Sequence, residues 1–120
     1  MINAKEIVRT ALLNNAELIA LLGGDRIYQL VAKEADEYPR ITFFEIDNAD
    51  AAFADDRPYG SSVSIQIDVW SKGSTFAIAN EVDKTMKELG LARISAPDFY
   101  EQDTKIYHKA LRYRGQFEGE

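Results

Sequence analysis

Residues 63–70 of the chain read VSIQIDVW, the most regular pattern in the sequence. β-Branched residues occupy every second position from Val63 to Val69, and they alternate with Ser64, Gln66 and Asp68. Side chains of a strand point alternately to its two faces, so the alternation predicts a strand with one buried face and one polar face. Trp70 ends the stretch on the polar side.

The residues after this strand change to helical spacing. A polar turn, residues 71–74, leads into an apolar stripe formed by Ala79, Val82, Met86 and Leu89. Ser74 is placed to cap the helix, because its hydroxyl can accept a hydrogen bond from a free amide of the first turn. Gly90 fits the position after the helix, where a left-handed backbone is common. We therefore expect a half-buried strand followed by a helix that packs on its apolar face.

The overall composition limits the possible functions. A length of 120 residues predicts one domain spanning 1–120. The net charge of −6 argues against a surface devoted to nucleic acid, and the lack of cysteine excludes thiol chemistry and cysteine metal sites. The apolar run Leu18–Leu22 is too short to span a membrane, and the first residues lack the features of a secretory signal. A cytoplasmic origin is therefore the expectation.

The first half of the chain predicts helices followed by strands. Asn3 can cap a helix from Ala4 to about Asn14, and Asn15 can cap a short helix that Gly23-Gly24 ends. Residues 25–32 then predict a short strand or an extended arm, and residues 33–38 a loop. The next strand, residues 40–47, carries large apolar groups on both faces, which indicates a central strand or one face against a partner.

The stretch from Asn48 to Gly60 is the longest irregular one. At about 13 residues it exceeds most connections, whose median is about 4–6 residues, so we expect an exposed loop or a projecting hairpin tip. The spacing of its acids does not match a calcium-binding loop. This leaves either a solvated loop or an acidic interaction surface, formed by Asp47, Asp50, Asp55 and Asp56 beside Arg57.

The last part of the chain predicts two more strands. One begins at Leu91–Ile94 and is followed by a turn or bulge, the apolar pair Phe99-Tyr100 and a second turn; the other is Lys105–Phe117. The predicted fold is α+β: an antiparallel β-sheet of four to five strands, with one face covered by the N-terminal helix and the second helix, and a long loop between two strands.

His108 is the only histidine, so any metal site would have to be completed by carboxylates alone. Nearby Lys109, Arg112 and Arg114 repel a cation. A general base needs an orienting carboxylate, and none is near in sequence. We therefore interpret His108 as a structural or surface residue and predict no catalytic residue, metal site or cofactor.

The basic residues of the last strand indicate contact with a partner. This strand carries Arg112 and Arg114, together with Lys105, Lys109 and His108, and it can contact phosphates or an acidic neighbour. The simpler alternative is an ordinary solvated or edge-protecting strand face.

Trp70 is the best single candidate for a subunit contact, because tryptophan is enriched at buried interfaces. The alternative is that Phe99, Tyr100 or the long loop covers it within the subunit.

The order of these segments resembles the small tail-completion proteins of long-tailed bacteriophages and prophages, also called tail-to-head joining proteins and similar to tail-terminator subunits. The resemblance covers nearly the whole chain. It rests on Ile27-Tyr28 after a Gly-Gly helix stop, on residues 38–43 (YPRITF), on residues 68–73 (DVWSKG) before a helix, and on a closing strand rich in Tyr and Arg.

This resemblance implies a non-enzymatic structural protein. It implies a ring, expected to be hexameric, that caps the head-proximal end of the tail tube and joins tail to head. The implied partners are further copies of the chain, the tail tube protein and the head-neck connector proteins, with DNA only as passing cargo and no membrane. The implied location is the virion, with the host cytoplasm during assembly.

A ring needs two unlike patches that meet between neighbouring subunits. We hypothesise that the acidic loop Asp47–Asp56 meets the basic strand face His108–Arg114, or else that the loop points into the channel and repels DNA. The candidate interface residues are Asp47, Asp50, Asp55, Asp56, Arg57, Trp70, Arg112 and Arg114.

Three other interpretations stay open. Two lie within the virion: a head-side neck adaptor, or another minor tail protein. The third is a small ferredoxin-like ligand-binding or enzyme domain using His108, which predicts a concave pocket with a perturbed titratable group.

Overall fold

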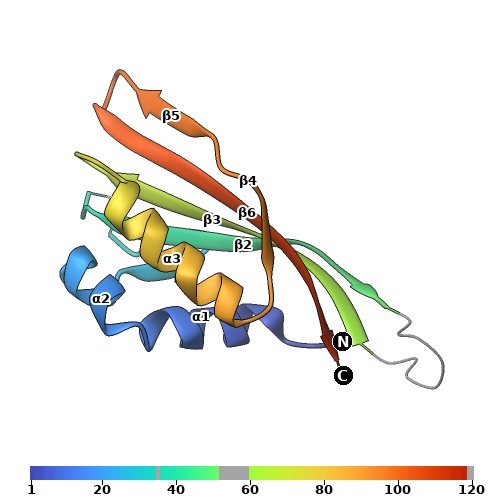
Figure 1. Cartoon of the computed structure of the whole chain (residues 1–120). Coiled ribbons are helices and arrows are strands. Elements are labelled where there is room, and N and C mark those ends of the chain that lie inside the picture. The colour runs from blue at the N-terminus through green and yellow to red at the C-terminus, as the bar shows by residue number, and fades with distance from the viewer. Residues whose placement is uncertain (35, 52–59, 119–120) are drawn as a thin grey trace.

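The computed structural model describes residues 1–34, 36–51 and 60–118 and has an α+β fold (Figure 1). No helix among the described residues is long and apolar enough to cross a membrane. The helices are α1 (Ala4–Leu13), α2 (Ala16–Leu22) and α3 (Phe76–Glu88), and the strands are β1 (Ile27–Gln29), β2 (Arg40–Asp50), β3 (Gly60–Ser71), β4 (Ala92–Ser95), β5 (Asp98–Glu101) and β6 (Ile106–Glu118).

The six strands form one sheet in the order β1-β2-β3-β6-β4, and β5 also pairs with β6. The α+β prediction is confirmed, with a strand count slightly above the expected four to five. The expectation of a purely antiparallel sheet is wrong at one edge, because β1 pairs with β2 in parallel. Residues 98–101, predicted only as an apolar patch after a turn, form β5 and pair with the start of β6.

Both ends of the stretch from Asn48 to Gly60, predicted as a loop or hairpin tip, belong to strands. β2 continues through Asp50, which pairs with Ser61, and the Ala51 N–H donates to the Gly60 carbonyl at 3.0 Å. Asn, Asp and Ala have low strand propensity, so their pattern gave no sign that they extend an antiparallel ladder. β2 and β3 therefore form an antiparallel pair as far as Asp50 and Ser61, and residues 52–59, where the predicted loop or hairpin tip falls, lie outside the described part of the chain.

The predicted helix ends are largely confirmed. The Asn3 and Asn15 side chains accept hydrogen bonds from the first turns of α1 and α2. Gly90, with φ of +88°, follows α3 as predicted, in the left-handed region that glycine adopts without strain. The N-cap of α3 is Thr75 rather than Ser74, although the Ser74 hydroxyl does accept the Phe76 N–H at 3.2 Å.

The core lies between the sheet and the three helices, all of which pack on one face of the sheet (Figure 1). The apolar side of β3, Val63 to Val69, is fully buried as predicted, and so is most of the stripe on α3. We call this side the helix face and the opposite side of the sheet the open face. The molecule measures 51 × 26 × 23 Å, and the β2–β3 hairpin and the end of β6 project beyond the helices (Figure 1).

A buried polar cluster fastens α3 to the sheet. The hydroxyl of the fully buried Tyr113 donates to Asp83 Oδ1 at 2.8 Å, and Asp83 Oδ2 forms ion pairs with Lys87 at 2.8 Å and Arg93 at 3.2 Å. Burial alone would raise the pKa of Asp83. Hydrogen bonds from Lys87 and Tyr113 and the charge of Arg93 outweigh it and lower that pKa, while burial raises the pKa of Tyr113.

Candidate functional site on the open face of the sheet

The open face consists of four rows of side chains that run across the strands. Residues directly opposite each other in a ladder lie on the same face, so the register of β2, β3 and β6 fixes each row. The rows are Arg40, Trp70, His108 and Phe99; then Thr42, Asp68 and Ala110; then Phe44, Gln66, Arg112 and Ser95; and last Asp47, Ser64, Arg114 and Ala92.

The first row is an aromatic and cationic ladder centred on Trp70. Its ring stacks on His108 with 3.8 Å between centroids and 10° between planes, and Phe99 lies 5.4 Å from His108 on the far side. The Arg40 guanidinium lies 5.7 Å from the Trp70 ring, within the range of a cation–π contact. The Trp70 indole N–H donates to the Thr42 hydroxyl at 2.9 Å. The row therefore holds Trp70 in one orientation before any partner binds.

The residues that pack on Trp70 differ from those that the sequence indicated. Its stacking partner is His108, which the sequence did not single out for this contact, and Phe99 contacts that histidine instead. Tyr100 lies on the other face, where its ring is 4.8 Å from that of Tyr107. Trp70 stays partly exposed.

A hydrogen-bonded chain continues from the first row into the third. His108 Nε2 lies 2.7 Å from Asp68 Oδ1, which also accepts from Gln66 Nε2 at 2.9 Å. Arg112 Nη2 donates to Gln66 Oε1 at 2.8 Å. Asp68 is only 5% exposed, and these two hydrogen bonds satisfy the Oδ1 atom of its buried side chain. This series of hydrogen bonds links His108 to the exposed Arg112.

No carboxylate is near His108 in sequence, but the fold brings one to its ring. Asp68 lies 40 positions earlier and reaches the ring because β3 pairs with β6. The alternation in both strands placed the two residues on polar faces. What the sequence lacked was the pairing and its register, which bring them together.

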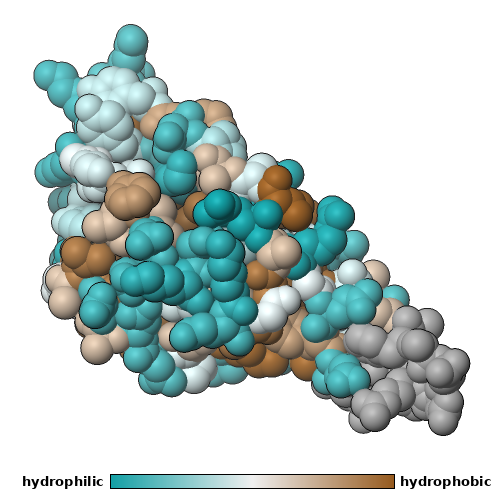
Figure 2. Space-filling view, in the orientation of Figure 1, coloured by the Kyte–Doolittle hydropathy of each residue, from teal (hydrophilic) through white to brown (hydrophobic). Residues whose placement is uncertain are grey.

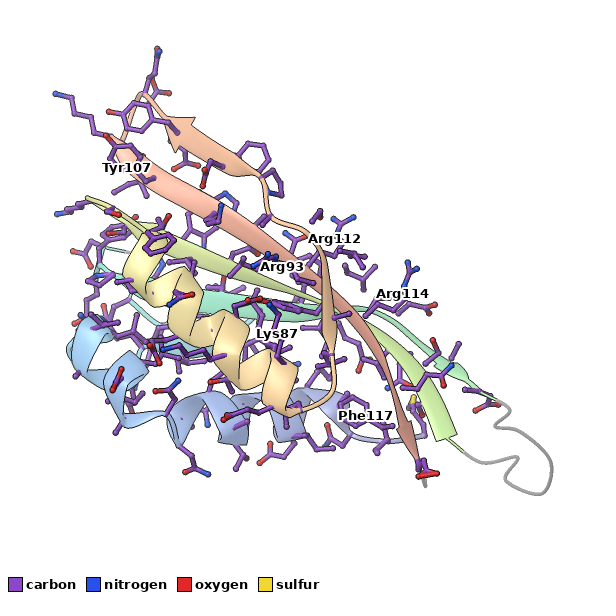
Figure 3. The ribbon with its side chains drawn as sticks, viewed as in Figure 1. Lys87, Arg93, Tyr107, Arg112, Arg114 and Phe117 are labelled. Carbon is purple, nitrogen blue, oxygen red and sulfur yellow. The ribbon has the colours of Figure 1, made fainter. Side chains whose placement is uncertain are left out.

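The basic strand face is narrower than predicted. Lys105 lies in the turn before β6, and Lys109 points to the helix face, where its Nζ donates to the Ala96 carbonyl and to Asp98. Arg112 and Arg114 are exposed on the open face, and Figure 3 shows them extending from β6 away from α3. The Arg114 Nε is 3.5 Å from the Ser64 hydroxyl, a long hydrogen bond.

The acidic candidates do not form one patch among the described residues. Asp47 is opposite Ser64, in the same row as Arg114 on the open face. Asp50 is opposite Ser61, whose hydroxyl accepts the N–H of Ile2 from the helix side, so Asp50 points to the other face. The remaining three candidates lie outside the described residues: Asp55, Asp56 and Arg57.

A ligand-binding or enzyme domain centred on His108 predicts a pocket at the histidine, and two large hollows of the described chain lie elsewhere. A hollow of about 590 Å³ lies between the α1–α2 junction and α3, and another of about 470 Å³ is lined by Tyr38, Lys72 and Ile106. Neither includes His108. No group of three or more His, Cys, Asp or Glu side chains among the described residues is placed to hold a metal ion.

A family model described as tail completion protein gp17 matches residues 6–117. The chain belongs to this family. It is therefore a structural component of phage tails, as the resemblance in its sequence indicated. No curated protein matches the sequence.

The fold of this tail completion protein also occurs in a solved particle. A chain in the structure titled virion of native gene transfer agent particle superposes with a TM-score of 0.68 at 22% sequence identity. The alignment covers 93% of this chain and 92% of the other. At this identity the likeness shows a common fold.

Proposed function

We propose that this tail completion protein caps the head-proximal end of the tail tube as a ring and takes part in joining the tail to the head. Membership of the tail completion family carries the proposal. The open face supports it, because aromatic rings, amides and guanidinium groups provide a broad contact surface on a rigid sheet. We propose no chemical reaction for it.

The proposed partners follow from that position. A ring of six copies is built from one domain spanning the whole chain, with the tail tube protein below it and the head-neck connector proteins above it. DNA passes through the ring as cargo. The protein is incorporated into the virion after assembly in the host cytoplasm.

We assign Trp70, Arg112 and Arg114 to the subunit interface and the acidic hairpin end, meaning Asp47 and Asp50 of β2, to the channel. Two neighbours in a ring approach from opposite sides of a subunit. Asp47 and Arg114 lie on the same open face, so they are poorly placed to contact two neighbours that lie on opposite sides of the subunit. An acidic end projecting into the channel would repel passing DNA. In the alternative predicted from the sequence, the acidic hairpin end contacts Arg112 and Arg114 of the next subunit. A charge swap between the acidic residues and the two arginines distinguishes this contact from the channel assignment.

Electron microscopy of lysates from a producing strain with this gene deleted tests the proposal. We expect DNA-filled heads beside unattached tails, some of them overlong. Heads that have lost their DNA beside finished tails of normal length would instead place the protein on the head side of the neck. Intact infectious virions would refute a structural role in completing the tail.

A further inference from the structure

The helix face carries a hollow whose rim is acidic. The hollow of about 590 Å³ is lined by Glu17 from α2 and by Glu81, Lys84 and Glu88 from α3. Glu81 is already engaged, since it accepts from Lys84 at 3.1 Å and from Asn15 at 3.2 Å, and these bonds lower its pKa. Glu17 and Glu88 are exposed at the rim. The hollow therefore has more carboxylate than ammonium groups around it.

The open face carries the complementary charge on projecting side chains. Arg112 and Arg114 lie two residues apart on one side of β6, so their Cα atoms are about 7 Å apart. Arg112 donates to an amide oxygen and Arg114 to a hydroxyl. Among the described residues neither guanidinium forms an ion pair with a carboxylate. Each guanidinium has N–H groups that can donate hydrogen bonds to a carboxylate of another molecule.

We propose that the open face receives the helix face of a second copy of this chain, with Arg112 and Arg114 entering the acidic hollow at Glu17 and Glu88. This inference rests on the ring of the proposed function and names its contact. The two surfaces lie on opposite sides of the subunit, so repeated pairing runs head to tail and can close.

Charge, shape and size support this pairing. Exposed arginines meet a carboxylate-rimmed hollow, which favours encounter in one orientation. The molecule is 51 Å by 26 Å across its longer extents, which leaves room for the roughly 800 Å² that each partner contributes to a standard interface. The helix face is largely hydrophilic over the helices, as expected for a surface matched by charge (Figure 2). The hydrogen bond from Arg112 to Gln66 also orders one guanidinium before binding.

A charge-swap experiment tests the pairing in the producing strain with the gene deleted and supplied in trans. Replacing Arg112 and Arg114 with Glu places like charges against the acidic rim and is expected to lower the yield of joined virions about 100-fold or more. Replacing Glu17 and Glu88 with Arg is expected to do the same. Combining all four changes restores opposite charges and should recover the yield to within about tenfold of wild type.

The matched control combines the Arg112 and Arg114 replacements with Asp47→Arg and Asp50→Arg. Recovery with this set, and not with the helix-face set, overturns the inference in favour of the acidic hairpin end. Recovery with neither set, while wild-type tails carry a ring, also overturns it. Wild-type tails without any ring would refute the proposed function itself. All of these residues lie at exposed positions, and thermal unfolding of each purified variant checks its fold.

A crosslinking measurement gives an independent readout. The chain has no cysteine, so Glu17→Cys combined with Arg112→Cys places the only two thiols on opposite faces. On assembled tails a short bismaleimide should produce a ladder of covalent multimers from the double variant and no more than dimers from either single variant. A ladder from Asp47→Cys with Arg112→Cys instead would contradict the proposed contact.

Discussion

Replacing Tyr113 with Phe tests the cluster that fastens α3 to the sheet. The change removes one hydroxyl and keeps the aromatic ring, so the loss is confined to the hydrogen bond donated to Asp83 at 2.8 Å. Asp83 keeps Lys87 and Arg93 as partners. The Asp83 carboxylate is therefore not left without charged partners, and no cavity larger than one oxygen atom forms.

The expected cost can be worked out from these contacts. A hydrogen bond to a charged group contributes about 1.5–3 kcal/mol, and the two remaining partners place Tyr113→Phe near 2 kcal/mol. For a chain of this length, each 1 kcal/mol lowers Tm by about 4 °C, which gives a fall of about 8 °C. Asp83→Ala should cost more, about 3–5 kcal/mol, because it loses the same hydrogen bond and also leaves the buried Tyr113 hydroxyl without its acceptor.

The assay is urea unfolding at pH 7, followed by circular dichroism. Tyr107→Phe is the matched control: it lies on the same strand and the same face, but its side chain is 46% exposed, so its effect should stay within about 0.5 kcal/mol. The Tyr113→Phe and Asp83→Ala changes should also be non-additive, since each removes the hydrogen bond between the Tyr113 hydroxyl and Asp83. If Tyr113→Phe unfolds at the same urea concentration as Tyr107→Phe, the hydrogen bond from Tyr113 to Asp83 does not stabilise the fold.

Three further predictions concern stability. The pKa values of Glu81 and Asp83 are lowered in the folded protein from ordinary values of 4.5 and 3.8, so their contribution is present above those values and is lost as pH falls through the folded pKa values. The free energy of unfolding should therefore fall below about pH 4.5, and less steeply in Asp83→Asn; a flat profile between about pH 6 and pH 3 would contradict the assignment. Asp68→Ala removes the acceptor shared by His108 and Gln66 and should cost about 1–3 kcal/mol by urea unfolding, whereas an unchanged midpoint would show that the open-face chain contributes nothing. Gly115→Ala would place its Cβ 2.6 Å from Leu91 Cδ2 and 3.2 Å from Leu91 Cα, so overpacking should cost about 1–3 kcal/mol; a variant as stable as wild type would mean that the Leu91 segment shifts freely.

Local signals in the sequence predicted the helices well. Asn3, Asn15 and Gly90 act at helix ends for reasons confined to a few neighbouring residues, and the stripe on α3 depends on spacing alone. The buried face of β3 followed from strict alternation. These features need no knowledge of what packs against them.

Features that depend on strand pairing were beyond the sequence. Nothing local distinguishes a parallel β1 from an extended arm, because the difference lies in how the chain returns from β1 to β2. The low-propensity end of β2 forms a strand only because β3 supplies its hydrogen bonds.

For the candidate site too, local signals were readable in the sequence and strand pairing was not. Alternation placed Trp70, Arg112 and Arg114 on a polar face, which the structure shows to be one surface. The stacking of Trp70 on His108 and the bond from His108 to Asp68 required the register of β3 with β6. The acidic patch was divided because Asp47 and Asp50 lie on a strand, where residues three positions apart point to opposite faces.

Cryo-electron microscopy of isolated tails, with and without this protein, tests whether it caps the tail as a ring. We predict a ring of density at the head-proximal end of wild-type tails, into which copies of this fold can be placed, and its loss from tails made without the gene. Density for this fold only on the head side of the neck, or tails with identical ends in both preparations, would show that the protein does not cap the tail.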